Sequence, residues 1–315
     1  MKAYLQETVW GGRRLEKLYG RPLPKSKRIG ESLELSAVPG QESTVAAGAL
    51  QGWTVSRLTR EFGEELLGRP VWSKHGGRFP LLIKLIDAEQ DLSVQVHPDD
   101  NYARDRELGD FGKSEAWFIL RSHRGRIARG FKRRTNAVRF HTAIKGHRAE
   151  ELLSYVNVRA GDLVPISPGT VHAICGGVML YEVQQNSDLT FRIYDYGRKG
   201  SDGRLRELHV DRAMDIVDYD AELAPITRHG QGGPAQECLI EGSHFRLDLH
   251  RAAATVLAQA TFRVLTLIRG TACLQGEKTE FVLRPADTYL IPADRGFVVV
   301  PLDEDRLEYL VATPT

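Results

Sequence analysis

Short apolar segments bounded by turn residues are the feature that most limits the folds open to this chain. Runs at 81–86, 117–120, 163–166, 178–183 and 262–268 are separated by Gly, Pro and Asp. Strands are usually about four to eight residues long, whereas helices need about ten or more. Many short strands between turns predict a mainly β fold of two barrels or jelly rolls.

Helical periodicity is confined to a few segments. The clearest follows Thr54, a suitable N-cap, and continues to Leu66, before Gly68 and Pro70 end the run. Two further helices are expected at His147–Tyr155 and Asp211–Val217. We interpret all of these helices as insertions in the first barrel.

Gly and Pro residues between positions 226 and 236 predict a linker. The expected domains are residues 1–225, with the helical insertions, and a smaller β domain at residues 237–315. A weak internal repeat supports two related barrels, because residues 161–169 align with residues 286–293. In this alignment His172 falls opposite Gly296.

Composition excludes several classes of protein. The 315 residues are 42% hydrophobic and 27% charged with a formal net charge of +2, which is typical of a globular protein. No dense Lys/Arg block carries interleaved aromatics, and no apolar signal core or stretch of about 18 apolar residues is present, so we expect neither a nucleic-acid nor a membrane partner. The three widely spaced cysteines predict reduced thiols and a cytoplasmic location. They are Cys175, Cys238 and Cys273. The sequence does not indicate an oligomeric state.

Residues 92–97 predict a strand with one polar face, because successive side chains of a strand point to opposite faces. The polar face would carry Ser93, Gln95 and His97, and the other face Leu92, Val94 and Val96. Such a strand inside a barrel would direct two possible metal ligands into its interior. The alternative is a half-exposed strand with an ordinary polar outer face.

Four positions suggest a metal site, and these are Gln95, His97, Glu115 and His172. Two imidazoles, a carboxylate and an amide oxygen suit zinc, and less specifically iron(II), cobalt or manganese. Each residue taken singly is more often an ordinary surface or hydrogen-bonded side chain. The set together predicts a catalytic site with open positions for substrate.

Several motifs in one order resemble the type I mannose-6-phosphate isomerases, a branch of the cupins. The longer matches are residues 92–100, 112–117, 161–174 and 182–195, and shorter ones lie at 10–12, 30–32, 79–84 and 206–209. They cover the chain from about Trp10 to His209, and the length is similar to the short bacterial form. The resemblance implies two cupin barrels, with the catalytic site in the first. Because Gly296 stands opposite His172 in the internal repeat, we expect no metal ligands in the second.

The resemblance also implies roles for individual residues. The zinc ligands of the family match Gln95, His97, Glu115 and His172, with one Zn²⁺ per chain. Its catalytic residues match Lys113, Glu182 and Arg192, and its substrate-binding residues match Lys84, with Ser93 and Arg198 near the phosphate. The implied reaction interconverts D-mannose 6-phosphate and D-fructose 6-phosphate through a cis-enediol. The base could be Glu182, a metal-bound water or Lys113, and the sequence does not decide among them.

Three positions depart from the family pattern, namely Ser114, Phe191 and Arg129. Arg129 begins the most basic run of the chain, residues 129–134. It either alters the edge of the cleft or points to solvent, and we expect it to point to solvent. Two alternative functions are an iron-dependent oxygenase and a sugar-phosphate-binding cupin without catalysis. The cationic residues Lys84, Lys113 and Arg192 favour a sugar phosphate over a small apolar substrate, and Glu182 beside the metal favours catalysis over binding alone.

Overall fold

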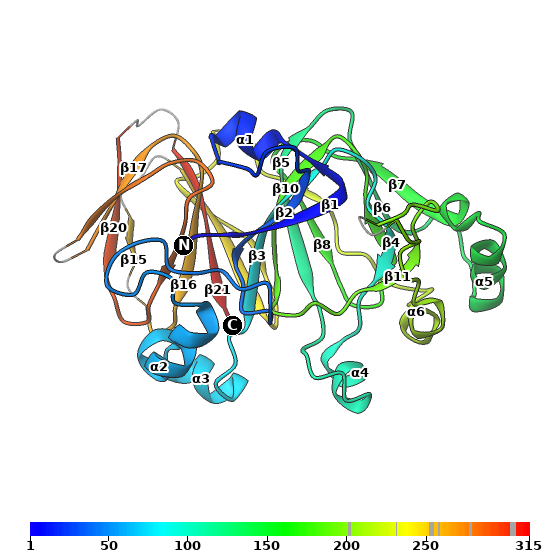
Figure 1. Ribbon diagram of the computed structural model, residues 1–315, viewed down its shortest axis with the longest axis horizontal. Helices are drawn as coiled ribbons and strands as arrows, with labels where there is room; N and C mark the ends of the chain where they lie inside the picture. Colours follow the sequence, from blue (N-terminus) through cyan, green and yellow to red (C-terminus); the bar gives the residue numbers. More distant parts are fainter. Residues whose placement is uncertain (201–202, 231, 252–254, 258, 277–278, 303–306) are drawn as a thin grey trace. The chain divides into compact units, whose positions relative to one another are not determined.

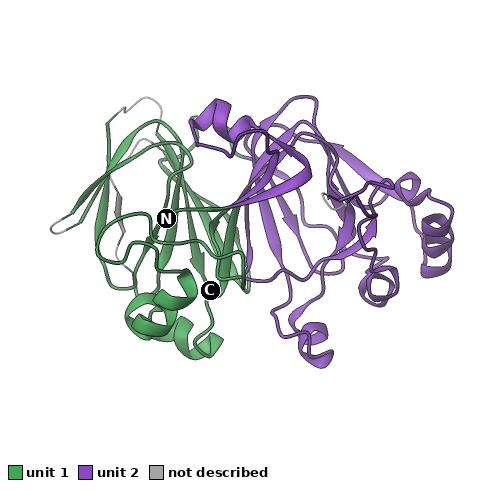
Figure 2. Ribbon diagram, in the orientation of Figure 1, with its two compact units in different colours: residues 1–4, 33–84, 229–315 green, residues 5–32, 85–228 purple. Residues whose placement is uncertain are grey.

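The computed structural model describes residues 1–315 except 201–202, 231, 252–254, 258, 277–278 and 303–306 (Figure 1). The described chain forms two compact units, shown in green and purple in Figure 2. Unit 1 contains Met1–Tyr4, Leu33–Lys84 and His229–Thr315, and unit 2 contains Leu5–Ser32 and Leu85–Arg228. Both units are built mainly from β-strands, as the short apolar segments predict.

The strands that hold the candidate site belong to two sheets. The larger has the order β1 (Tyr4–Gly12), β2 (Ile29–Leu35), β3 (Leu81–Ala88), β10 (Val178–Gln185), β5 (Glu115–Ser122), β8 (Asp162–Ile166) and β12 (Thr227–Arg228). The smaller has the order β11 (Phe191–Tyr194), β4 (Val94–Val96), β9 (His172–Ile174), β6 (Arg126–Phe131) and β7 (Leu153–Asn157). The chain passes from one unit to the other within β2 and β3.

The smaller sheet of unit 2 has two different faces. Val94, Val96 and Ala173 pack with Phe140 of α5 (Ala137–Lys145) and Ala213 of α6 (Val210–Ile216). Both helices lie beside this sheet in Figure 1. Because side chains alternate along a strand, the residues between these apolar positions face the interior of the barrel, where the candidate ligands lie.

Unit 1 also contains two sheets. One has the order β13 (Gln236–Glu241), β14 (Phe245–Arg251), β21 (Glu308–Pro314), β16 (Arg263–Arg269) and β19 (Thr288–Ile291). The other has the order β15 (Thr255–Leu257), β20 (Phe297–Pro301), β17 (Ala272–Gln275) and β18 (Glu280–Leu283). Leu265 and Tyr309 of the first sheet share a buried core with Leu274 and Val299 of the second.

The helices are divided between the units in a way that the sequence did not indicate. Helices α1 (Arg14–Tyr19) and α4 (Asp100–Asp105) lie in unit 2 with α5 and α6, whereas α2 (Val55–Leu67) and α3 (Arg69–His75) lie in unit 1. The end of α2 bonds to the C-terminal part of the chain, since Leu66 O accepts from Ala293 N at 3.0 Å and Leu67 O from Phe262 N at 3.2 Å. These long-range contacts assign residues 33–84 to the unit that contains the C-terminal strands. The domain limits expected from the sequence, 1–225, 226–236 and 237–315, stay a prediction.

The local helix predictions have mixed outcomes. Helix α2 begins after Thr54, whose side chain accepts a hydrogen bond from Arg57 N at 3.2 Å, and α6 lies where it was expected. The prediction of a helix at His147–Tyr155 is wrong except for one short turn. Only the 3₁₀ turn η1 (Ala149–Leu152) forms, and β7 follows it because Leu153 and Tyr155 pair with β6.

Part of the predicted linker lies in a paired strand, and the internal repeat has a structural counterpart. Within residues 226–236, Thr227 pairs with Leu163 in the short strand β12, and residues 232–236 are exposed. In the repeat, Asp162 Oδ2 accepts from Arg159 N at 2.8 Å, and Asp287 Oδ2 accepts from Arg284 N at the same distance. The same turn thus precedes β8 and β19. In the described part of the chain no helix has the length and apolar character needed to cross a bilayer.

Candidate metal centre and active site

Neighbouring strands of the smaller sheet bring Gln95 and His172 together. Gln95 of β4 lies directly opposite His172 of β9, and its Nε2 is 3.3 Å from His172 Nε2. His97 follows β4 directly, and its ring centroid is 4.8 Å from that of His172. The alternation expected for residues 93–97 therefore places these side chains in the interior. Leu92 departs from it, because the strand begins at Val94 and Leu92 packs in the core between the sheets.

Glu115 reaches the same point from β5 of the larger sheet. Its Oε1 is 3.4 Å from His172 Nε2, and its Oε2 is 3.5 Å from His97 Nε2. The candidate ligand atoms of these three residues all lie within 4.8 Å of one another, and all three side chains are buried. The structure thus brings together a carboxylate and two imidazoles that are far apart in the sequence.

The orientation of both imidazoles fits a cation. Nδ1 of His97 lies 2.9 Å from Leu189 O, and Nδ1 of His172 lies 2.9 Å from Thr170 O. A carbonyl only accepts, so each Nδ1 carries the proton and each Nε2 presents a lone pair toward Glu115. Burial lowers the pKa of His172 to about 4, which keeps the ring neutral. Lone pairs facing a buried carboxylate repel it, and a bound metal ion would relieve this repulsion.

Gln95 completes the donor set after a rotation of its amide. As placed, its Nε2 faces His172. The oxygen and nitrogen of an amide are exchanged by a 180° flip, which would present Oε1 to a metal bound by the other three residues. Two imidazoles, a carboxylate and an amide oxygen are a donor set that fits a divalent transition metal.

Glu182 and Lys113 border this cluster. Glu182 is buried in β10 opposite Trp117, whose Nε1 donates to Glu182 Oε1 at 2.9 Å. The Trp117 ring packs edge-on against His172 at 5.5 Å. Lys113 is buried, and its Nζ lies 3.3 Å from Glu115 Oε2. Trp117 thus fixes the orientation of Glu182, one of the candidate bases, a contact that the sequence did not reveal.

The loop that carries Lys113 is fixed by Gln185. Its Oε1 accepts from Ser114 N at 3.0 Å, and its Nε2 donates to Asp100 Oδ1 at 2.9 Å. Ser187 Oγ donates to Phe111 O at 2.7 Å in the same region. Gln185 and Ser187, which follow Glu182 in the chain, therefore hold the loop with Lys113 in place beside Glu115.

Arg192 belongs to a cluster of cations at one edge of the site. Its Nη1 donates to Glu207 O at 2.8 Å, and its backbone N donates to His209 Nδ1 at 3.1 Å. Burial lowers the pKa of Arg192, and the charge of Arg206 lowers it further. Arg206 lies 3.3 Å from Asp195 Oδ2, and Arg198 pairs with the other oxygen of the same carboxylate. Two guanidinium groups thus pair with one buried carboxylate, and Arg192 interacts electrostatically with all three groups.

The remaining predicted substrate residues are placed as follows. Ser93 is buried directly before β4. Lys84 is buried in β3 and is the last residue of the unit 1 segment 33–84. Arg198 is held by Asp195 and by the carbonyl oxygen of Asp91, so its guanidinium is already engaged.

The expectation that Arg129 points to solvent is wrong. Its side chain is 6% exposed, and its Nη2 donates to Ala224 O at 2.7 Å. Arg129 lies opposite His172 in the pairing of β6 with β9. Because directly opposed residues share a face of a sheet, Arg129 faces the interior with His172.

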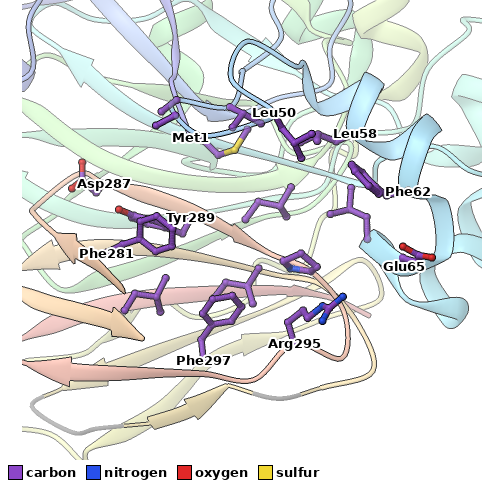
Figure 3. A pocket seen from close by; sticks show the side chains of 18 residues that line it. Met1, Leu50, Leu58, Phe62, Glu65, Phe281, Asp287, Tyr289, Arg295 and Phe297 are labelled. Atoms are coloured by element: carbon purple, nitrogen blue, oxygen red, sulfur yellow. The ribbon is translucent and has the colours of Figure 1, made fainter. Parts of the chain in front are cut away.

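A separate cavity of about 520 Å³ lies in unit 1. Figure 3 shows that its lining includes Leu50, Phe62, Phe281 and Phe297, with few charged side chains such as Arg295. None of the predicted ligands or catalytic residues lines it. An apolar lining does not suit a sugar phosphate, so the chemistry points to the cluster in unit 2.

Comparisons with known proteins agree with this geometry. Residues 1–127 match the family model described as phosphomannose isomerase type I, catalytic domain. The chain is 38% identical to the probable mannose-6-phosphate isomerase GmuF of Bacillus subtilis, over 100% of this chain and 98% of that protein. It is 34% identical to the mannose-6-phosphate isomerase ManA of the same organism, over 94% and 93% of the two chains. A crystal structure of the mannose 6-phosphate isomerase from Bacillus subtilis superposes with a TM-score of 0.88 at 31% identity, covering 99% of this chain and 98% of that one.

Proposed function

This chain belongs to the mannose-6-phosphate isomerase family, and we propose that it interconverts D-mannose 6-phosphate and D-fructose 6-phosphate at the cluster formed by Gln95, His97, Glu115 and His172. The observation that carries the proposal is the meeting of a buried metal-ligand set with fixed cations and a carboxylate in one unit. His97, Glu115 and His172 converge, while Lys113 and Glu182 border them.

The reaction requires a proton to leave C2 of the open-chain aldose and return at C1, with the hydroxyl and carbonyl exchanging places. We assign this proton transfer to Glu182. The hydrogen bond from Trp117 fixes one oxygen of the Glu182 carboxylate and so defines the orientation of the carboxylate. A positioned acid or base of this kind contributes about 10²–10⁴ in rate.

Negative charge develops on the oxygens of the enediol, and cations must compensate it. Lys113 is ion-paired with Glu115 beside the cluster, so we assign it to stabilising charge rather than accepting a proton. A divalent metal in the cluster would supply further positive charge to these oxygens. We propose zinc, one per chain, because the donor set of nitrogen and oxygen atoms suits it.

The cation cluster at Arg192 gives the phosphate a place to bind. Arg198 and Arg206 share the carboxylate of Asp195, so the group as a whole keeps an excess of positive charge. A planar guanidinium group can donate to two phosphate oxygens at once. This arrangement favours a phosphorylated sugar over the small apolar substrate of an oxygenase. Ser93 and Lys84 remain proposed substrate-binding residues.

Two further expectations belong to this proposal. The cysteines Cys175, Cys238 and Cys273 are unpaired, which supports a reducing compartment such as the cytoplasm. The division into a catalytic domain at residues 1–225 and a smaller domain at residues 237–315 is proposed on the sequence pattern.

A coupled assay tests the function directly. Purified protein is given mannose 6-phosphate, and the fructose 6-phosphate formed is measured with a coupling enzyme. We expect turnover that a chelator abolishes and added Zn²⁺ restores. Absence of turnover in metal-replete protein would contradict the proposal.

A further inference from the structure

Four side chains form a continuous row across the smaller sheet of unit 2. The strand registers pair Arg192 with Gln95, Gln95 with His172, and His172 with Arg129. Directly opposed residues of antiparallel strands share one face. The row therefore runs Arg192, Gln95, His172, Arg129 on the inner face, with an arginine at each end and two candidate ligands between them.

The apolar residues around the row confirm which way it faces. Ala128 and Ala173, the neighbours of Arg129 and His172 along their strands, pack in the core beneath α5 and α6. Ile127 and Ile174, two residues from Arg129 and His172, pack in the core between the sheets with Trp117. Arg129 thus lies on the side of the sheet that carries the site.

The guanidinium of Arg129 is only partly satisfied. Its Nη2 is held by Ala224 O at 2.7 Å. Its Nε is buried and has no hydrogen-bond partner among the residues that the structure describes. An unsatisfied buried donor on a charged group costs free energy, and such groups need a compensating role. A substrate oxygen would supply the missing acceptor.

The two ends of the row differ in charge. At the Arg192 end, Arg198 and Arg206 add further guanidinium groups around Asp195. At the Arg129 end, the hydrogen bond that holds the side chain among the described residues goes to a neutral carbonyl, Ala224 O. A phosphate dianion suits the end with several cations, whereas a single guanidinium suits one oxygen of partial or unit charge.

We propose that Arg129 binds the reacting end of the substrate, opposite the phosphate, and stabilises the oxygen on which the enediolate charge develops. This inference rests on the proposed isomerase function and adds a residue to it. Strands are about 4.8 Å apart, so the α-carbons of Arg192 and Arg129 are separated by roughly 14 Å, and both long side chains can extend toward a substrate between them. Arg129 donates a hydrogen bond and transfers no proton, because a guanidinium stays protonated.

Kinetics of three variants test the proposal. Arg129→Met removes the charge and the donors, Arg129→Gln keeps a donor for Ala224 O without the charge, and Arg129→Lys keeps the charge. We expect kcat to fall by about 10²-fold for Met and Gln, with a smaller loss for Lys, by analogy with the removal of one donor to a developing oxyanion. KM and the inhibition constant of inorganic phosphate, which probes the phosphate end, should change by less than about threefold. Arg126→Met is the matched control, because Arg126 is an exposed arginine of the same strand.

The outcomes separate this inference from the function itself. Wild-type turnover with equal kcat in Arg129→Met would overturn the role of Arg129 and leave the isomerase function standing. Loss of phosphate inhibition in Arg129→Met would overturn the assignment to the reacting end. Wild-type kcat in Arg129→Gln would show that Arg129 only holds Ala224. If Arg129→Met does not fold, the kcat values of Arg129→Gln and Arg129→Lys decide, since equal values would overturn a role for the positive charge. Wild-type protein without turnover would instead contradict the proposed function.

Discussion

Trp117 and Glu182 face each other across β5 and β10, and the indole Nε1 donates to the Glu182 carboxylate at 2.9 Å. Both side chains are buried, so this bond fixes the carboxylate that we assign to proton transfer. A hydrogen bond to a charged group contributes about 1.5–3 kcal/mol. Because this carboxylate is assigned to proton transfer, loss of the bond should lower kcat as well as stability.

Trp117→Phe tests that relationship. The variant keeps an aromatic ring against His172 and removes only the Nε1 donor. We expect kcat to fall by about 10- to 100-fold, which corresponds to the range above, while metal content stays unchanged. Trp53→Phe in unit 1 is the matched control. Unchanged kcat in Trp117→Phe would remove the positioning role.

Arg192→Lys tests the role of Arg192 in the cation cluster that is proposed to bind the phosphate. Lysine keeps one positive charge but loses the planar fork that can hold two oxygens. We expect kcat/KM to fall by about 10²-fold, or around 3 kcal/mol of transition-state binding. Metal content should be intact, because arginine is not a ligand. Arg139→Lys on the exposed surface of α5 is the control, and a fully active Arg192→Lys enzyme would make Arg192 a structural residue.

Thr54→Ala tests the N-cap of α2. The Thr54 hydroxyl accepts from Arg57 N at 3.2 Å, and loss of such a cap costs about 1 kcal/mol. We expect a lower denaturation midpoint with unchanged isomerase activity. Thr54→Ser, which keeps the acceptor oxygen, should restore stability. Equal stability of the alanine and serine variants would show that the cap contributes nothing.

His250 predicts a pH dependence of stability. Burial lowers the pKa of His250, which stacks on Tyr309 with ring centroids 4.8 Å apart. The unfolded chain then binds the proton more readily than the folded one, so stability is full above about pH 6.5 and decreases as the pH falls below it. His250→Phe keeps the stacked ring and removes the titration. Its melting temperature should decrease less than that of the wild type between about pH 7.5 and 5.5, and an equal decrease would contradict this explanation.

Local sequence patterns predicted the parts of the structure that depend on local geometry. The cap at Thr54 and the alternation from Ser93 to His97 are examples, because each follows from the backbone period of one element. His97, Glu115 and His172 were selected for their chemistry, and the structure brings them together. Convergence of side chains that are far apart in sequence is what spacing alone could not show.

Long-range pairing accounts for what the sequence did not reveal. The helix expected at His147–Tyr155 is replaced by β7, since pairing with β6 outweighs a weak local helical pattern. Residues 33–84 join the C-terminal strands through contacts such as Leu66 with Ala293. Arg129 was expected in solvent because an arginine in a basic run is usually exposed, and only its register with His172 reveals the inner face.

Metal content measured together with turnover tests the central claim most directly. We expect purified protein to contain one divalent metal per chain, and His172→Gln to lose both the metal and the formation of fructose 6-phosphate. His123→Gln, which alters an exposed histidine in the turn after β5, should retain both. Full turnover in protein shown by elemental analysis to be free of metal would contradict the account.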